Sequence, residues 1–281
     1  MKNKYLEFLK YGRRLANNTV KSIENDLAQF GDNLIEATRA NVERFVMEQN
    51  KQGLSTATVA RRIASLKGFF EWQIYNGQRT GINPADGKLS PKVKNESHQA
   101  ISEEKLYALY TNAHDDILKV AIALSGYAGL RIGEIVGLGK TSKVFRDSEG
   151  HLAINLTKTK GDRPRKVTLA LVPHKELIEQ YQNGLIGQRG RLSEHGLWRK
   201  MRRYFDSQGM GDLSPHGLRA TFASLLVAKG VRVDIVRDML GHASLAGNEI
   251  TSRYVSTNSV EKQYQALTNI QQQRRGAELC F

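Results

Sequence analysis

The stretch Leu213–Tyr254 constrains the fold most, because it reads as helices with chemically active side chains at their ends. Ser214 is a favourable N-cap and Pro215 suits the first helical position, so a helix is predicted to start there. His216 and Arg219 then fall in its first turn, three residues apart on one face. A helix start attracts anions through its free N–H groups, and these two side chains add proton transfer and forked hydrogen bonding.

Two more side chains complete this stretch. His242 follows Gly241, where the next short helix is expected to end, and Tyr254 comes after a polar loop. Imidazole, guanidinium and phenol groups together can carry out phosphoryl transfer without a metal. Taken singly, each histidine is more often structural, and Tyr254 is one of 10 tyrosines. The hypothesis therefore depends on all of these groups meeting in one place.

An excess of basic residues indicates what such a site would act on. The chain of 281 residues has 42 Lys and Arg against 28 Asp and Glu, a net charge of +14. This balance favours a polyanionic partner such as nucleic acid, and a merely solvated basic surface is the alternative. The acidic residues lack the spacing of metal ligands, which disfavours a metal nuclease. No metal and no cofactor is expected.

Several classes of protein are disfavoured by what the sequence lacks. No apolar run reaches the roughly 18 residues of a membrane span, and the N-terminus has no signal-peptide core. The one cysteine of the chain, Cys280, provides neither a disulfide framework nor a Cys-based zinc site. We expect no membrane association and a cytoplasmic, nucleoid-associated protein.

The N-terminal part predicts amphipathic helices. One starts near Asn18 or Thr19, a second runs from about Thr38 to Gln52, and a third follows the N-cap Ser55. Basic side chains decorate the third helix, where they are candidates to bind DNA or form an ordinary solvated face. These candidates are Arg61, Arg62 and Lys67.

A polar segment after Gly77, GQRTGINPADGKLSPKVKNESHQ, has almost nothing to bury and predicts a linker. Its lysines suit either a crossing of the phosphate backbone or a soluble tether. The chain is long enough for two cores, so we expect a helical domain over 1–85, a basic linker over 86–98 and a second domain over 99–281.

The second domain is expected to begin with a helix capped by Ser102 and a longer apolar helix that breaks at Gly129. Arg131 and Glu134 follow in AGLRIGEIVGL, at a spacing that lets the carboxylate orient the guanidinium. Alone, this pair is more often a structural ion pair.

Residues 143–171 alternate as short strands, in KVFRD, HLAINLT and RKVTLAL, and make the expected fold mainly α with a small β-hairpin or sheet. The turn TKTKGDRPR is strongly basic, and a lysine at its tip could supply a proton. A helix near Ser193–Gln208 has a basic face opposite Leu197, Trp198, Met201 and Phe205. The DNA-binding candidates of the turn and this helix are Arg163, Arg199, Arg202 and Arg203.

The order of these motifs resembles the tyrosine recombinases, the phage integrase and Xer family. Arg in GLRIGE, Lys in a basic hairpin, HGLR, LGH and a final Tyr follow one another over the whole chain. Each motif is weak alone, whereas the order and spacing are specific. The resemblance implies two domains, a helical SAM-like core-binding domain and an α+β catalytic domain with a C-terminal tail helix.

The resemblance also implies roles for individual residues. Arg131 and Arg219 would clamp the scissile phosphate, with Glu134 as a supporting residue. His216 would act as a base toward the tyrosine, and His242 would hydrogen-bond the phosphate.

For the proton donor and the nucleophile, the family pattern leaves an alternative residue in each case. Lys160 best fits the hairpin lysine, and Lys158 is the runner-up. Tyr254 would be the nucleophile, but it stands 12 residues after His242, a longer interval than simpler family members use. Tyr264 is the fallback, in a segment over 259–270 that resembles the tail helix which family members dock into a neighbouring protomer.

The implied function is site-specific DNA recombination through a 3′-phosphotyrosine and a Holliday junction. A homotetramer would hold two double-stranded sites with paired inverted repeats, assembled by exchange of the C-terminal helix. The alternatives are a DNA-binding regulator that kept the fold without catalysis, and a type IB topoisomerase. Integration, transposon or plasmid resolution and chromosome dimer resolution all stay open, as does the target sequence.

Overall fold

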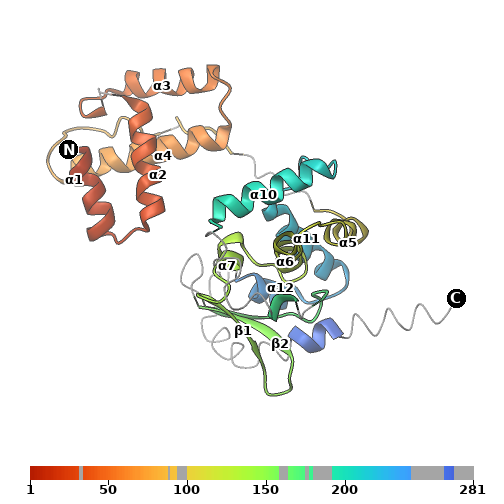
Figure 1. The fold of residues 1–281 in the computed structure, drawn as a ribbon. Coiled ribbons are helices and arrows are strands. Elements are labelled where there is room, and N and C mark those ends of the chain that lie inside the picture. The colour runs from red at the N-terminus through yellow and green to blue at the C-terminus, as the bar shows by residue number, and fades with distance from the viewer. Residues whose placement is uncertain are drawn as a thin grey trace. The chain divides into compact units, whose positions relative to one another are not determined.

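The chain divides into two units, residues 1–96 and 97–281, and each is described by itself. The computed structural model describes residues 1–31, 34–87, 89–93, 100–157, 164–174, 177–179, 192–241 and 263–268 (Figure 1). Within these residues, no helix combines the length and the apolar character needed to cross a membrane.

The N-terminal unit is helical throughout its described elements. Their bounds are α1 Lys2–Glu7, the π-helix η1 Phe8–Gly12, α2 Asn17–Phe30, α3 Arg39–Lys51 and α4 Thr56–Tyr75. The N-caps Thr38 and Ser55 accept hydrogen bonds from backbone N–H groups three residues on, and the sequence predicts the cap at Ser55. The long α4 packs against α1, α2 and α3 (Figure 1). Its Phe69 and Phe70 are fully buried.

Two features of this unit depart from the sequence-based expectations. The first is α1 with η1, which lies before the three helices predicted from the sequence and buries Tyr5 and Leu9. The second is the segment after Gly77, which was expected to bury almost nothing. Asn83 and Ala85 are buried there, and the Asn83 side chain donates to the Lys67 carbonyl at 2.9 Å. The start of the segment therefore packs on the helical unit.

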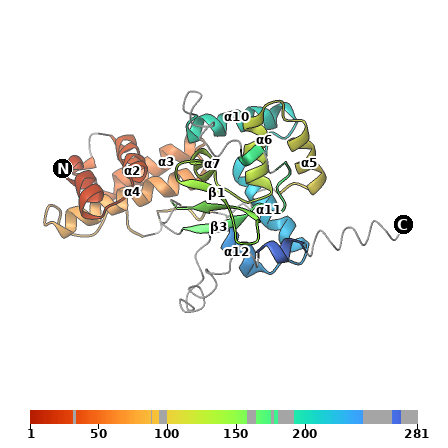
Figure 2. The same ribbon diagram turned by 60° about the horizontal axis from the view of Figure 1, so that its bottom comes forward.

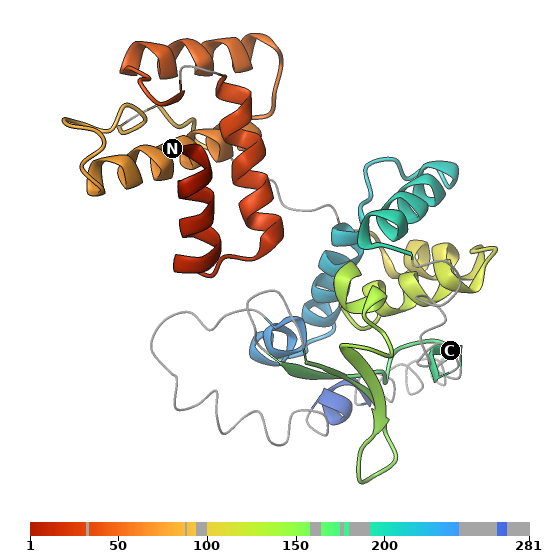
Figure 3. The same ribbon diagram turned by 60° about the vertical axis from the view of Figure 1, so that its left-hand side comes forward.

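The C-terminal unit contains the larger core. Its described helices are α5 Glu103–Thr111, α6 Asp116–Gly126, α7 Ile132–Val136, α10 Glu194–Ser207, α11 Pro215–Ala228 and α12 Val233–Leu240. The centre is α6, which is buried from Val120 to Gly126 and packs against α5, α7, α10 and α11. Figures 1 and 3 show α5, α6, α10 and α11 on one side of the sheet.

A three-stranded antiparallel sheet in the order β1-β2-β3 completes this unit (Figure 2). The strands are β1 Ser142–Arg146, β2 Leu152–Leu156 and β3 Arg165–Thr168. Ser142 pairs with Leu156 and Leu156 with Arg165, so the basic turn predicted from TKTKGDRPR joins β2 to β3. Most of that turn, residues 158–163, lies outside the described residues. The mainly helical fold with a small sheet agrees with the prediction.

The free edge of β3 is covered by a short helical segment, residues 263–268. The Gln263 amide donates to the Lys166 carbonyl at 3.1 Å and accepts from the Thr168 N–H at 3.0 Å, as a neighbouring strand would. Leu267 is fully buried in the core of the C-terminal unit. Tyr264 stacks on His151, with ring centroids 3.5 Å apart. These contacts anchor the segment to its own C-terminal unit.

Candidate active site

Two glycines shape the turns that lead into the site. Gly129 and Gly241 have φ of +66° and +64°, a conformation that other residues rarely adopt. A Cβ on Gly129 would come within 2.5 Å of the Phe222 ring, so the turn also has no room for a side chain. Gly241 ends α12, as predicted for the residue before His242. Both motifs, AGLRIGE and LGH, thus pass through a turn that requires glycine.

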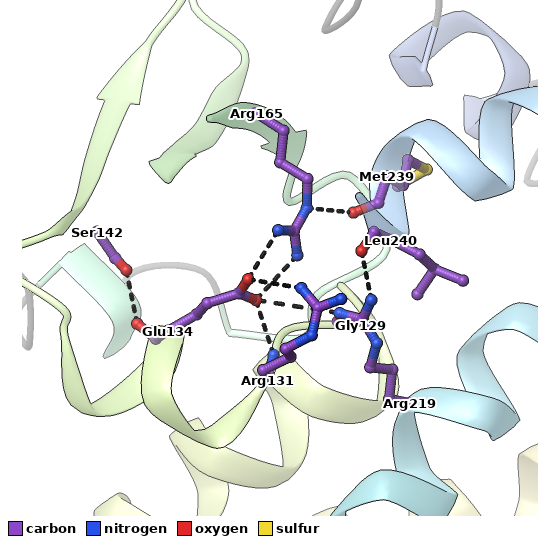
Figure 4. A network of polar contacts seen from close by, with 8 residues as sticks. All are labelled: Gly129, Arg131, Glu134, Ser142, Arg165, Arg219, Met239 and Leu240. Atoms are coloured by element: carbon purple, nitrogen blue, oxygen red, sulfur yellow. Dashed lines mark hydrogen bonds and ion pairs between the residues drawn. The ribbon is translucent and has the colours of Figure 1, made fainter. Parts of the chain in front are cut away.

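Arg131 and Glu134 form the pair that their spacing predicted (Figure 4). Arg131 is the N-cap of α7, and its backbone N–H donates to Glu134 Oε2 at 2.8 Å. Its Nη1 donates to Glu134 Oε1 at 3.1 Å. Ser142 Oγ donates to the Glu134 carbonyl at 2.6 Å and connects α7 to β1. The Arg131 side chain stays 27% exposed, whereas that of Glu134 is 3% exposed, so only the arginine can meet a ligand.

Arg165, at the start of β3, is a member of this cluster that the sequence analysis did not assign to the site. Its Nη1 and Nη2 donate to the two carboxylate oxygens of Glu134 at 2.7 and 2.9 Å. Its Nε donates to the Met239 carbonyl at 2.7 Å. A signal existed in the sequence: on a strand, Arg165 shares a face with Val167, which is fully buried, and an inward-facing arginine needs an anionic partner.

Arg219 joins the cluster from α11 (Figure 4). Ser214 caps that helix by accepting from the Gly217 N–H at 3.0 Å, as predicted. The guanidinium donates from Nη1 to the Gly129 carbonyl and from Nη2 to the Leu240 carbonyl. Its Nη1 is 4.0 Å from Glu134 Oε2. Arg219 therefore connects the turn before Arg131 to the end of α12.

The electrostatics of the cluster favour an additional anion. Burial alone would raise the pKa of Glu134, but the hydrogen bonds and charge of Arg165, with those of Arg131, outweigh it and lower that pKa. Burial, with the neighbouring charges of Arg131 and Arg165, lowers the pKa of Arg219 to about 9, which leaves it protonated at neutral pH. Among the described residues of the cluster, one carboxylate thus faces three guanidinium groups, and a phosphate would complete the balance.

The remaining candidates for catalysis are less fully described. His216 lies exposed at the start of α11. Lys160, Lys158, His242 and Tyr254 lie outside the described residues. The structure therefore brings together Arg131, Glu134 and Arg219 of the predicted set and adds Arg165.

The DNA-binding candidates of the N-terminal unit have partners within the chain. Arg61 Nη1 donates to Ser22 Oγ at 2.9 Å and also to the carboxylate of Asp26, whose side chain is 3% exposed. Arg62 donates to the Gln49 side chain. Lys67 Nζ lies 2.8 Å from Asp86 Oδ1. These contacts give each side chain a structural role, and contact with DNA stays a prediction.

The candidates on α10 differ from one another. Arg199 and Arg203 are exposed, whereas Arg202 donates to the Leu213 carbonyl and lies 3.4 Å from Asp206. Arg163 lies outside the described residues. The prediction that Trp198 belongs to the apolar face was wrong, because it is 43% exposed while Leu197 is buried. Adjacent helix positions differ by about 100°, so Trp198 turns away from the core.

A helical N-terminal unit and a site of clustered arginines suit a protein that acts on a phosphate-containing partner, and comparison with known proteins identifies the family. Residues 99–261 match the phage integrase family, and residues 3–77 match the N-terminal SAM-like domain of phage integrases. The chain belongs to the phage integrase family of tyrosine recombinases, as its motif order predicted.

Similar proteins extend over most of the chain. A tyrosine recombinase XerC of Herpetosiphon aurantiacus is 29% identical, covering 93% of this chain and 92% of the relative. A tyrosine recombinase XerD of Halalkalibacterium halodurans is 25% identical over 90% of this chain and 92% of its own. Among solved structures, a lambda integrase dimer bound to a COC′ core site matches with a TM-score of 0.68 at 18% identity, covering 90% of this chain and 75% of that one. These likenesses agree with the predicted fold and with a site-specific recombinase.

Proposed function

We propose that this tyrosine recombinase cuts and rejoins DNA through a covalent 3′-phosphotyrosine at Tyr254. The observation that carries the proposal is the cluster in which Arg131, Arg165 and Arg219 surround the single carboxylate of Glu134. Three positive charges against one negative charge suit a phosphodiester, whose transition state gathers negative charge on its nonbridging oxygens. Arg131 and Arg219, presented from α7 and α11, are the two clamps in this proposal.

The proposed reaction conserves the phosphodiester bond. A phenol with a reference pKa near 10 is a weak nucleophile at neutral pH, so His216 takes the proton of Tyr254 as its oxygen attacks phosphorus. The bond from phosphorus to the 5′ oxygen breaks, and Lys160 gives that oxygen a proton. His242 hydrogen-bonds a nonbridging oxygen. The 5′ hydroxyl of another strand then attacks the phosphotyrosine and reverses each step, without a metal or ATP.

We propose that the N-terminal unit is the core-binding domain, with Arg61, Arg62 and Lys67 near the phosphates. Acting on DNA would place the protein at the nucleoid. A solved lambda integrase tetramer bound to a Holliday junction matches this chain with a TM-score of 0.68 at 19% identity. By analogy with that complex, four copies of this chain would join two double-stranded sites with inverted repeats.

Assembly by exchange of the C-terminal helix would act on the segment 263–268. Gln263 and Leu267 contact their own C-terminal unit here. If a neighbouring copy supplied the same two side chains to the same sites, the exchange would replace identical contacts and cost little free energy. The exchange would thus require release of the segment from β3.

Covalent capture tests the proposed function. The protein would be incubated with nicked duplexes that carry a randomised core, and any DNA that stays attached under denaturing conditions would be sequenced. We expect captured duplexes to share an inverted repeat. Tyr254→Phe should bind them without forming an adduct, whereas Tyr264→Phe should form it. An adduct that persists in Tyr254→Phe and disappears in Tyr264→Phe would assign the nucleophile to Tyr264.

A further inference from the structure

We propose that Arg165 is a positioning residue of the strand-transfer reaction, which acts by holding Glu134 and the end of α12 in one fixed arrangement. This inference rests on the proposed function, because it concerns the geometry of the same site. Arg165 is not among the residues that the order of motifs assigns to catalysis. Its contacts nevertheless join the elements that carry the assigned ones.

The guanidinium of Arg165 uses both of its edges. Nη1 and Nη2 pair with the two oxygens of Glu134, while Nε donates to the Met239 carbonyl in α12. The planar fork fixes these three acceptors relative to one another, which a lysine ammonium could not do. Nε, Nη1 and Nη2 of Arg165 all donate to protein acceptors, so this arginine is placed to hold protein groups together.

The backbone before His242 lies directly against Arg165. A Cβ added to Gly241 would be 2.9 Å from Arg165 Cδ and 3.0 Å from its Nη1. Glycine at this position therefore allows the guanidinium and the chain to meet. His242 is the next residue in the sequence. The path by which the chain enters the second histidine motif depends on Arg165.

Arg165 also fixes the position of Arg131, because both arginines bind the carboxylate of Glu134. The carboxylate accepts from the backbone N–H and Nη1 of Arg131 at 2.8 and 3.1 Å, and from Nη1 and Nη2 of Arg165 at 2.7 and 2.9 Å. A displacement of about 1 Å in a catalytic group can cost about 100-fold in rate. Arg165 thus holds the carboxylate that aims Arg131 and supports the backbone beside His242.

The stability of the fold does not by itself explain why Arg165 and Glu134 are buried together. Burying an arginine and a carboxylate costs desolvation, and apolar pairs of similar volume often stabilise a fold as well or better. Arg165 and Glu134 have side chains that are 7% and 3% exposed. A fixed geometry is what this pair provides and an apolar pair would not.

Arg165→Lys tests the proposal by separating binding from cleavage. The captured duplex would be used for single-turnover adduct formation and for binding at equilibrium, at a temperature where the variant is folded by circular dichroism. We expect cleavage to fall about 10- to 100-fold, while the binding constant changes less than about threefold. Arg146→Lys is the matched control, since Arg146 lies in β1 and pairs with Glu179 at 2.7 Å with 57% of its side chain exposed. It should cleave as the parent does.

A double-mutant cycle tests whether Arg165 acts through Glu134. Arg165→Lys and Glu134→Gln should each lower the cleavage rate. The double variant should lose less than the product of the two single losses, because both variants disturb the same interaction. If Arg165→Lys does not fold, the apolar pair Glu134→Met with Arg165→Met replaces it. That pair should fold and bind DNA but cleave at least about 100-fold more slowly.

Two results would overturn the inference and are distinct from failure of the proposed function. A folded Arg165→Lys that cleaves as fast as the parent removes the positioning role, as does an apolar pair with parental cleavage. If the parent protein captures no duplex covalently, the proposed function is contradicted. The inference about Arg165 then fails too, because it rests on that function.

Discussion

Arg219 and Leu240 connect two helices of the candidate site, because Nη2 of the arginine in α11 donates to the carbonyl of the last residue of α12. Nη1 of the same guanidinium donates to the Gly129 carbonyl, in the turn before Arg131. One buried side chain therefore sets the distance between the glycine turn at Gly129, in the AGLRIGE motif, and the glycine turn at Gly241, in the LGH motif. A phosphate held by Arg219 would be held relative to both.

Arg219→Lys should disable cleavage more than binding. A lysine keeps the charge but cannot present a planar fork to two carbonyls and a phosphate. We expect the single-turnover rate of adduct formation to fall about 100- to 1,000-fold, as for loss of one preorganised donor. Arg232→Lys is the control, because Arg232 is 78% exposed and pairs with Asp234. An Arg219→Lys protein that cleaves at the parental rate would contradict the role of a phosphate clamp.

Local contacts could be predicted from the sequence, and the long-range contacts of the site could not. Ser55 and Ser214 cap their helices, and Arg131 meets Glu134, because each contact spans three residues. Arg165 meets Glu134 from 31 residues away, so no helical spacing reports it. Its inward position on β3 was the available signal.

The missed packing of the N-terminal unit has a similar cause. Tyr5 and Leu9, both buried, are one helical turn apart, which is an amphipathic signal in the sequence. Asn83 is buried because its amide bonds backbone groups of Lys67 and Ala85. Composition cannot reveal such a contact, since a polar segment with its hydrogen bonds satisfied packs well against a core.

Glu134→Gln should change how stability depends on acid. The folded-state pKa of Glu134 lies below its ordinary value of 4.5, despite burial, because Arg165 and Arg131 favour the carboxylate. A lowered folded pKa contributes stability that is present above pH 4.5 and is lost as pH falls through the folded pKa. Urea unfolding from pH 7 to pH 3 should therefore show a shallower loss of stability for Glu134→Gln than for the parent.

The same variant should be less stable at pH 7. Removing the carboxylate leaves Arg165 and Arg219 buried without their counter-ion, at a cost of about 3 kcal/mol. Glu179→Gln is the matched control, because Glu179 is 32% exposed and bonds only to Arg146 among its described contacts. Equal acid dependence of the Glu134→Gln protein and the parent would show that the cluster does not hold Glu134 ionised.

Variants of the basic side chains of α10 should differ in how strongly their DNA binding depends on salt concentration. Each phosphate contact that is lost reduces the slope of log K against log salt by about one. Arg199→Ala and Arg203→Ala should each show this loss with unchanged stability, because both side chains are exposed. Arg202→Ala should lower the free energy of unfolding instead, since it breaks bonds to Leu213 and Asp206. Identical slopes for all three variants and the parent would remove α10 from the DNA interface.

The choice between Lys160 and Lys158 as proton donor can be made with a modified DNA. A 5′-bridging sulfur leaves as a thiolate, and a thiol with a pKa of about 8.5 needs no proton, unlike an alcohol. With ordinary DNA, Lys160→Ala should cleave about 100- to 10,000-fold more slowly than the parent. With the sulfur-containing duplex it should approach the parental rate, while Arg219→Ala stays slow with both. Selective rescue of Lys158→Ala in place of Lys160→Ala would transfer the role of the proton donor to Lys158.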